Sequence, residues 1–330
     1  MLIALLGDVM LGRLVNDRLK DAPAEYPWGD TLPVLRRADV RIANLECVLA
    51  AGGEPEPGKV FHFRSDPGNV ESLRCAGIDL VSLANNHVLD FGPDAFREMP
   101  PRLDAAGILH AGAGRDREEA SMPAVLQAAG TTIGVIAFTD NQPGWEADHK
   151  PGVYYVPVTG ADRRSVELLD RVRRTRSRTG LVIVSAHWGA NWGSAVPRQH
   201  RTLAHALVEA GADVVYGHSP HIFRGVELYR NRPILYSTGD FVDDYAVDPV
   251  AHNDQSFIFQ LDTEGTTPRT LRLYPTVIRD FQARLAGAAS ADIAHRMQRM
   301  SAHLGTGSIW REDEGCLEIV IAGEQRDASH

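Results

Sequence analysis

The chain has 330 residues, a formal net charge of −9 and a hydrophobic fraction of 44 %. This length and composition are those of a globular protein and exclude a disordered or fibrous chain. The negative charge disfavours nucleic acid as a partner, because proteins that bind polyanions usually present a basic face.

Cysteine usage and apolar runs bear on the compartment. Cys47, Cys75 and Cys316 are odd in number and lack the spacing of a metal site, which favours a reduced, cytoplasmic protein. Cys75 lies in an apolar pattern and is predicted to be a core residue. The N-terminal apolar run is too short for a signal peptide, and no later run reaches the roughly 18 residues that span a bilayer. We therefore expect no membrane partner, and the sequence leaves the oligomeric state open.

Short apolar runs that end abruptly in polar residues recur along the chain. Runs of this length, rich in β-branched residues, are typical of strands buried on both faces. They are Leu2–Leu6, Asp39–Ala43, Leu80–Ala84, Thr132–Phe138, Leu181–Ala186, Val214–Tyr216 and Pro233–Ser237.

Helical patterns lie between many of these runs. Glycines follow three of them at the positions where helices commonly end, and the alternation predicts an α/β fold. In the third pattern Val166, Leu169 and Val172 form the predicted inward stripe, and in the fourth Leu203, Leu207 and Val208 do. The predicted helices are Pro67–Ala76, Pro93–Ala106, Asp162–Thr175 and Pro197–Ala210, with Gly77, Gly107 and Gly211 after the first, second and fourth.

The last part of the chain changes character. A hairpin-like pair of strands is predicted around residues 266–268, followed by a helix at Ala291–Leu304 and a strand at Cys316–Ile321. Because no linker composition interrupts the chain, we predict one domain over 1–330, with 263–330 as a C-terminal extension packed on it.

Ligand-type side chains stand at five separate strand ends. In α/β sheets ligands bind outside the carboxyl ends of the strands. Carboxylate and amide oxygens together with imidazoles suit a divalent ion. Each residue alone has a structural alternative: a turn or N-cap, a surface acid, or a hydrogen-bonded core histidine. The set comprises Asp8, Glu46, Asn86, His187, His218 and His221.

These motifs, in this order, resemble the CapA family of the calcineurin-like metallophosphatase superfamily. The motifs are Gly7-Asp-Val-Met-Leu-Gly-Arg, Asn44-Leu-Glu, Asn85-Asn-His, His187-Trp-Gly, Gly217-His-Ser-Pro-His and Ser237-Thr-Gly-Asp, and the resemblance covers about residues 1–262. It implies a four-layer α/β/β/α sandwich with the site at the ends of two central sheets.

The resemblance also implies roles for individual residues. Asp8 corresponds to the first-motif metal ligand, Glu46 to the bridging carboxylate and Asn86 to the amide ligand. His87 corresponds to the catalytic histidine, and His187, His218 and His221 to the later metal ligands. The superfamily's Asp-x-His motif is broken here by Met10, whose thioether is a poor ligand for hard ions. We therefore expect one divalent ion (Ca, Mn or Zn), no organic cofactor and impaired phosphoesterase chemistry.

One metal with several histidines suits acid/base chemistry at carbon. His87 and one of His187, His218 or His221 are predicted to act on opposite faces of that carbon, and Asp8, Asp90 or Asp240 to orient an imidazole. The resemblance to the lasso-peptide epimerase implies inversion of the C-terminal residue of a ribosomal precursor peptide. The alternatives are a phosphoesterase or other hydrolase, and an accessory protein of poly-γ-glutamate capsule assembly.

The substrate is predicted to be a peptide or small molecule. Trp188 and Trp192 beside His187 are candidate substrate-binding residues, with packing as the alternative. Arg64 is a candidate carboxylate clamp, with a structural ion pair as the alternative. Asp240 is also assigned to substrate binding. The basic run 163–178 is interpreted as a solvated helix face, with docking of an acidic leader peptide as the alternative.

Overall fold

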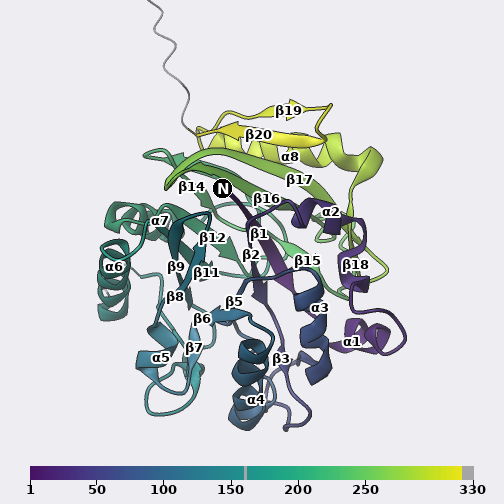
Figure 1. The fold of residues 1–330 in the computed structure, drawn as a ribbon, viewed down its shortest axis with the longest axis vertical. Coiled ribbons are helices and arrows are strands. Elements are labelled where there is room, and N and C mark those ends of the chain that lie inside the picture. Colours follow the sequence, from purple (N-terminus) through teal and green to yellow (C-terminus); the bar gives the residue numbers. More distant parts are fainter. Residues whose placement is uncertain (160–161, 322–330) are drawn as a thin grey trace, which may run out of the picture.

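The computed structural model describes residues 1–159 and 162–321. Most strands of this part of the chain belong to two large sheets (Figure 1). The first sheet has ten strands and combines the N-terminal and C-terminal segments. In spatial order it contains β19 (Ile309–Arg311), β20 (Cys316–Val320), β17 (Thr267–Arg279), β16 (Gln255–Glu264), β1 (Leu2–Val9), β2 (Val40–Leu45), β5 (Leu80–Ser82) and β6 (Leu109–Ala111), with β15 (Asp240–Val242) paired to β1 and β18 (Gln282–Leu285) to β17.

The second sheet has six strands from the middle of the chain. Its central strands β9, β11, β12 and β14 are parallel, so their carboxyl ends lie at one edge. The order is β13 (Val226–Tyr229), β14 (Arg232–Leu235), β12 (Val214–His218), β11 (Leu181–His187), β9 (Thr131–Thr139) and β8 (Ala124–Ala128). Two small ribbons pair β3 (Val48–Leu49) with β4 (Arg64–Ser65) and β7 (Ala113–Gly114) with β10 (Gly152–Val153).

Helices cover the outer faces of the two sheets. One hydrophobic cluster joins the first sheet to α1–α4, a second fills the space between the sheets, and a third joins the second sheet to α6 and α7. This is the four-layer α/β/β/α sandwich, so the predicted fold class is confirmed. The helices are α1 (Arg13–Leu19), α2 (Leu32–Leu35), α3 (Val70–Cys75), α4 (Gly92–Ala105), α5 (Arg117–Ser121), α6 (Arg163–Arg176), α7 (Arg198–Ala210) and α8 (Ser290–His303).

The C-terminal segment extends the first sheet. β16 pairs antiparallel with β1, and β17, β20 and β19 continue outward from it. Helix α8 contacts β17, β19 and β20 of this sheet and β13 of the other (Figure 1). The predicted hairpin, helix and last strand are all present. Residues 322–330 of the predicted extension lie outside the described residues.

The helix patterns were predicted well in position and less well in orientation. Gly77, Gly107 and Gly211 have positive φ and follow α3, α4 and α7, as predicted. In α7 the predicted inward residues are buried.

The predicted inward stripe of α6 was wrong at Val166, which is 53 % exposed, and confirmed at Val172, which is buried, while Leu169 is partly buried against the core. The buried face of α6 also carries Ser165, Leu168 and Thr175. Two of these residues are polar and can be buried because their hydroxyls donate to the carbonyl oxygens of Pro157 and Arg171. Cys75 is half-buried rather than a core residue.

Candidate metal and acid/base site

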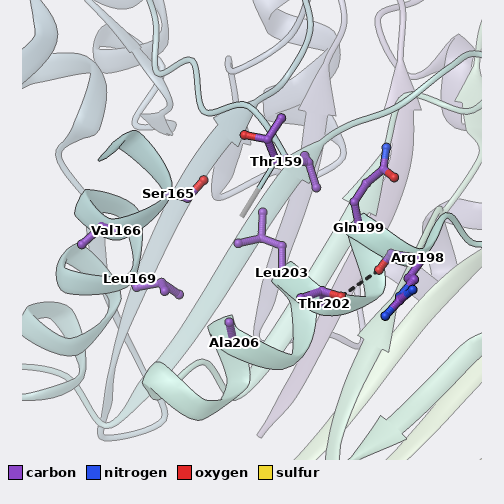
Figure 2. Close-up of a pocket in the computed structure, with 10 residues that line it drawn as sticks. Thr159, Ser165, Val166, Leu169, Arg198, Gln199, Thr202, Leu203 and Ala206 are labelled. Atoms are coloured by element: carbon purple, nitrogen blue, oxygen red, sulfur yellow. Dashed lines mark hydrogen bonds between the residues drawn. The ribbon is translucent and has the colours of Figure 1, made fainter. Parts of the chain in front are cut away.

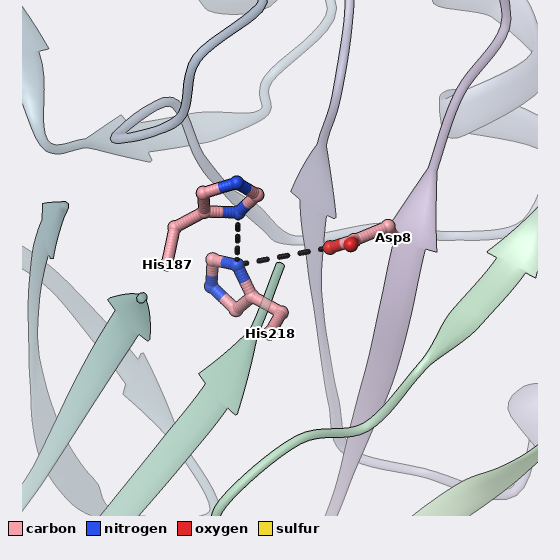
Figure 3. Close-up of side chains that lie close together, drawn as sticks. All are labelled: Asp8, His187 and His218. Atoms are coloured by element: carbon pink, nitrogen blue, oxygen red, sulfur yellow. Dashed lines mark hydrogen bonds and ion pairs between the residues drawn. The ribbon is translucent and has the colours of Figure 1, made fainter. Parts of the chain in front are cut away.

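Strand register brings the predicted ligands together. In the first sheet Asp8 of β1 lies beside Asn44 of β2 and Asp240 of β15, and in the second sheet His187 of β11 lies beside His218 of β12. All five side chains are buried. Figure 3 shows Asp8, His187 and His218 pointing toward one another from the ends of three strands.

The first candidate ligand group consists of Asp8, His187 and His218. One ligand atom from each lies within 4.8 Å of the others. Nδ1 of His187 is 2.8 Å from Nδ1 of His218, which is 3.7 Å from Oδ1 of Asp8. The side-chain oxygen of Asn86 lies 2.8 Å from Nε2 of His187, at the side of this group. The structure therefore assembles four of the six predicted ligands.

The two imidazoles of this group are held neutral. Burial lowers the pKa of His218 to about 3. Burial, reinforced by the neighbouring histidines, lowers the pKa of His187 well below its ordinary value. Because a histidine binds a metal only through an unprotonated nitrogen, this environment favours metal ligation at neutral pH.

Glu46 and Asn44 stand next to Asp8. Burial and the charge of Asp8 raise the pKa of Glu46 well above its ordinary value. The Asn44 side-chain amide donates to Oδ1 of Asp8 at 2.8 Å and lies 3.5 Å from Oε2 of Glu46. Glu46 thus lies next to the Asp8 carboxyl group, and its bridging role stays a prediction. Asn44 supports both acids, although the sequence analysis gave it no role of its own.

A second candidate group shares Asp8 and contains His221 and Asp240. Nδ1 of His221 is 3.0 Å from Oδ1 of Asp240, and Nε2 of His221 is 3.1 Å from the amide nitrogen of Asn191. Asp240 has no exposed surface. The parallel pairing of β15 with β1 places Asp240 beside Asp8, and its contact to His221 fits the predicted role of orienting an imidazole, whereas substrate binding by Asp240 stays a prediction.

Met10 lies away from these groups. Its side chain belongs to the hydrophobic cluster beneath the helices of the first sheet. Its sulfur accepts a hydrogen bond from the Gly12 backbone amide at 3.0 Å. The third position of the first motif therefore contributes to packing and turn geometry.

His87 forms a hydrogen-bonded dyad with Asp90. Its Nδ1 lies 2.6 Å from Oδ2 of Asp90, and its ring stacks on Phe63 with centroids 3.9 Å apart. Burial lowers the pKa of His87 to about 4, although the carboxylate of Asp90 opposes this shift. The ring is therefore neutral at pH 7. Its other nitrogen, Nε2, does not contact Asp90 and lies 3.7 Å from Oε1 of Glu46.

Lys59 completes this arrangement and was missed from the sequence. Its ammonium group pairs with Oδ1 of Asp90 and donates to the Asn86 carbonyl oxygen. It also lies 4.6 Å from the ring centroid of Trp145. One available signal was its rarity, because Lys59 is one of only three lysines in a chain rich in arginine.

A cavity of about 340 Å³ opens beside the dyad. His87 and His221 line it, whereas His187 and His218 are fully buried. Arg13 also lines it and was missed; its guanidinium lies 5.7 Å from the ring centroids of Phe61 and Phe63. The other lining residues are Asn191, Trp192, Tyr245, Ala246 and Asn253.

The predicted substrate-binding residues behave differently from one another. Trp192 is 49 % exposed and lines the cavity, so its role stays a prediction. Trp188 is fully buried, donates to the Tyr236 carbonyl oxygen at 3.0 Å and stacks on His200, so its predicted role is wrong. Arg64 does not line the cavity and lies over the ring of Phe91 at 4.5 Å, which contradicts a carboxylate clamp there. In both cases the preceding residue belongs to the site or its cavity: His187 precedes Trp188, and Phe63 precedes Arg64.

A second hollow of about 330 Å³ lies between α6 and α7, on the outer helical layer (Figure 2). Leu169 of α6 and Leu203 of α7 line it, together with Arg198 and Gln199 at the start of α7. None of the predicted site residues lines this hollow. The candidate functional site is therefore the one at the strand ends.

The structure combines a four-layer α/β/β/α fold with buried carboxylates and imidazoles at the ends of both central sheets. Residues 2–245 match the family described as bacterial capsule synthesis protein PGA_cap. The chain belongs to this family.

Relatives agree with this assignment, and a solved structure shares the fold. The chain is 32 % identical to the "Probable polyglutamine synthesis accessory protein" of Mycobacterium tuberculosis, over 96 % of this chain and 87 % of that protein. It is 23 % identical to the capsule biosynthesis protein CapA of Bacillus anthracis, over 97 % and 77 %. A hypothetical protein from Thermus thermophilus shares the fold with a TM-score of 0.51 and 17 % identity, over 83 % of this chain and 98 % of that one. Within the part of the chain that the structure describes, every helix is too short or too polar to cross a lipid bilayer.

Proposed function

We propose that this protein is a metal-dependent acid/base enzyme that acts on a peptide-like substrate, with His87 as the residue that moves the proton. The observation that carries the proposal is the His87–Asp90 dyad, which faces a cavity directly beside a buried set of carboxylates and imidazoles. A histidine oriented by a carboxylate and open to a cavity is a common general acid or base.

The donor set fits a divalent ion. Lys59 and Arg13, cationic residues of the site, are already paired with Asp90 and Asp244. Among the described residues, the buried acids Asp8 and Glu46 form ion-pair contacts only with histidines, not with a lysine or an arginine. A divalent ion held by Asp8, His187 and His218, with Asn86 and Glu46 beside them, would stabilise negative charge that develops on a substrate oxygen.

Each residue of the dyad has a distinct part in the proposed chemistry. Asp90 accepts from Nδ1 of His87 and so leaves Nε2 to take or give the proton. The Phe63 amide donates to Asp90 at 2.7 Å, and Lys59 holds the other carboxylate oxygen. Stacking on Phe63 fixes the plane of the imidazole. These contacts orient the ring before substrate arrives.

The preferred reaction is epimerisation at the Cα of a C-terminal peptide residue, because His87 lines a cavity beside the candidate metal ligands and can take a proton from a carbon whose carbonyl oxygen a bound ion would polarise. Return of a proton to the opposite face of that carbon inverts it. The test is incubation of candidate ribosomal precursor peptides with the Mn²⁺-loaded protein in deuterated water. Epimerisation predicts one deuterium at Cα and a D-residue in the product. An unlabelled, all-L product would refute it.

Hydrolysis is the second candidate, because two candidate ligand groups share the Asp8 carboxylate. Two ions that share a ligand can stabilise both the attacking and the leaving oxygen of a displacement. A panel of phosphate esters and γ-glutamyl amides, assayed with Mn²⁺, would detect this activity. Inactivity across the panel in protein with confirmed bound metal would reject it.

The names of the relatives, which refer to polyglutamine synthesis and to capsule biosynthesis, support a place in polymer synthesis for either activity. A purely accessory protein would tolerate loss of the proton carrier. The test is whether His87→Gln restores polymer synthesis in a strain that lacks this protein. Full restoration supports a non-catalytic role, whereas no restoration at a normal level of the variant protein supports an enzyme.

A further inference from the structure

We propose that Asp8, His221 and Asp240 form a second cation position, in which Asp240 supplies the ligand that Met10 cannot. The proposal rests on the proposed function in taking the site to be metal-dependent. It departs from the expectation of a single ion. Its basis is the geometry of β15 against β1, together with the buried Oδ2 of Asp240, which has no hydrogen-bond partner among the described residues.

Two Gly-Asp dipeptides build this position. Gly7-Asp8 lies near the end of β1, and Gly239-Asp240 lies at the start of β15. The Asp8 backbone amide donates to the Gly239 carbonyl oxygen at 3.0 Å, so the two backbones are too close for a side chain to fit between them. A Cβ atom on Gly7 would lie 2.0 Å from that oxygen, and Gly239 has a φ of +70°. Glycine is therefore required at both positions for the two aspartates to stand side by side.

Only one of the two carboxylate oxygens of Asp240 contacts His221. Its Oδ1 is 3.0 Å from Nδ1 of His221, but its fully buried Oδ2 has no hydrogen-bond donor among the described residues. If Asp240 served only to orient His221, its Oδ1 would be enough, and the burial of Oδ2 would have no function. A buried carboxylate oxygen without a donor is costly, so an additional positive partner is expected there.

The other neighbours of Asp240 make this need greater. Its carboxyl group lies against that of Asp243, whose Oδ2 also lacks a donor among the described residues. Asp8, Glu46, Asp240 and Asp243 are each at most 4 % exposed. When both carboxyl groups are ionised, Asp243 has no proton to donate. A divalent cation would neutralise this concentration of charge.

The ligand chemistry of the two positions differs. The first has one carboxylate and two imidazoles, whereas the second has two carboxylates and one imidazole. The second is richer in oxygen and therefore suits a harder ion such as Mn²⁺, Mg²⁺ or Ca²⁺ better than the first does. The shared Asp8 carboxylate would place the two ions within one bridged pair.

The test is metal stoichiometry by equilibrium dialysis against Mn²⁺ followed by elemental analysis, with spin coupling in the EPR spectrum as a second readout. We expect two ions in the wild type, with a coupled signal. Asp240→Asn, which keeps the shape and the contact to His221, should bind one ion with an uncoupled signal. His221→Gln, a second change in the same group, should lose the same ion. Circular dichroism checks that each variant is folded.

Asp243→Asn is the matched control, because it removes a neighbouring buried charge that belongs to neither ligand group. It should retain two coupled ions. One ion in both the wild type and Asp240→Asn would overturn the second position and leave the proposed function standing, whereas no bound ion in the wild type would refute the proposed metal dependence itself. Equal loss of one ion in Asp240→Asn and Asp243→Asn would show that charge, rather than ligation by Asp240, governs binding and would overturn the assignment.

Discussion

Replacing Lys59 by methionine tests whether its ion pair with Asp90 is buried and stabilises the folded protein. The Lys59 side chain is 13 % exposed and that of Asp90 is fully buried. Breaking a buried pair costs about 3–5 kcal/mol, because the remaining charge is left unpaired. The residual exposure of Lys59 favours the lower end, about 3 kcal/mol. His87 still contacts Asp90 and does not replace the lost charge, because its ring is neutral.

This cost translates into a measurable shift. A chain of 330 residues has an unfolding entropy of about 0.7 kcal/mol per degree, so Lys59→Met should lower the melting temperature by about 4 °C. Urea denaturation with a chelator present, so that metal binding does not contribute, measures the free energy directly. Lys20→Met is the matched control: the Lys20–Asp17 pair is more than half exposed, so its loss should change the free energy of unfolding far less than the loss of the Lys59–Asp90 pair. Equal small losses in both variants would refute the buried pair.

Three further predictions follow from the site. Trp188→Ala should cost about 3–5 kcal/mol of unfolding free energy, measured by urea denaturation, because it empties a buried, hydrogen-bonded position. Trp192→Ala should change stability by less than about 0.5 kcal/mol and raise KM in the peptide assay; a large loss of stability would show that Trp192 is a packing residue. Burial raises the folded-state pKa values of Glu46 and Asp240, so the metal-free protein binds protons more tightly than the unfolded chain does. Its stability should therefore fall as the pH rises above the ordinary carboxyl pKa of about 4, and added Mn²⁺ should reduce that loss; chelated protein whose stability rises over the same range would contradict this.

The sequence predicted what depends on local pattern. Apolar runs that end in Asp8, His187 and His218 locate strand ends, and the ends of parallel strands meet at one edge of a sheet. Order and chemistry of the motifs were then enough to predict the fold and most of the candidate ligands.

The errors and omissions arose where position depends on distant pairing or on side-chain direction. Asp240 stands beside Asp8 only because β15 pairs with β1 across more than two hundred residues, which no local pattern encodes. Lys59 and Arg13 reach the site from positions that no hydrophobic pattern in the sequence marks. Trp188 was predictable in principle: if His187 faces the site, the next residue of an extended segment faces away from it.

The most direct test of the central claim compares the wild type with His87→Gln at equal bound Mn²⁺, on whichever peptide or ester substrate the wild type turns over. Loss of a positioned proton carrier should reduce kcat by about 10²–10⁴-fold, while the metal content stays the same and chelation abolishes wild-type turnover. Equal turnover by His87→Gln, or wild-type turnover that survives chelation, would contradict a metal-dependent acid/base site built around His87.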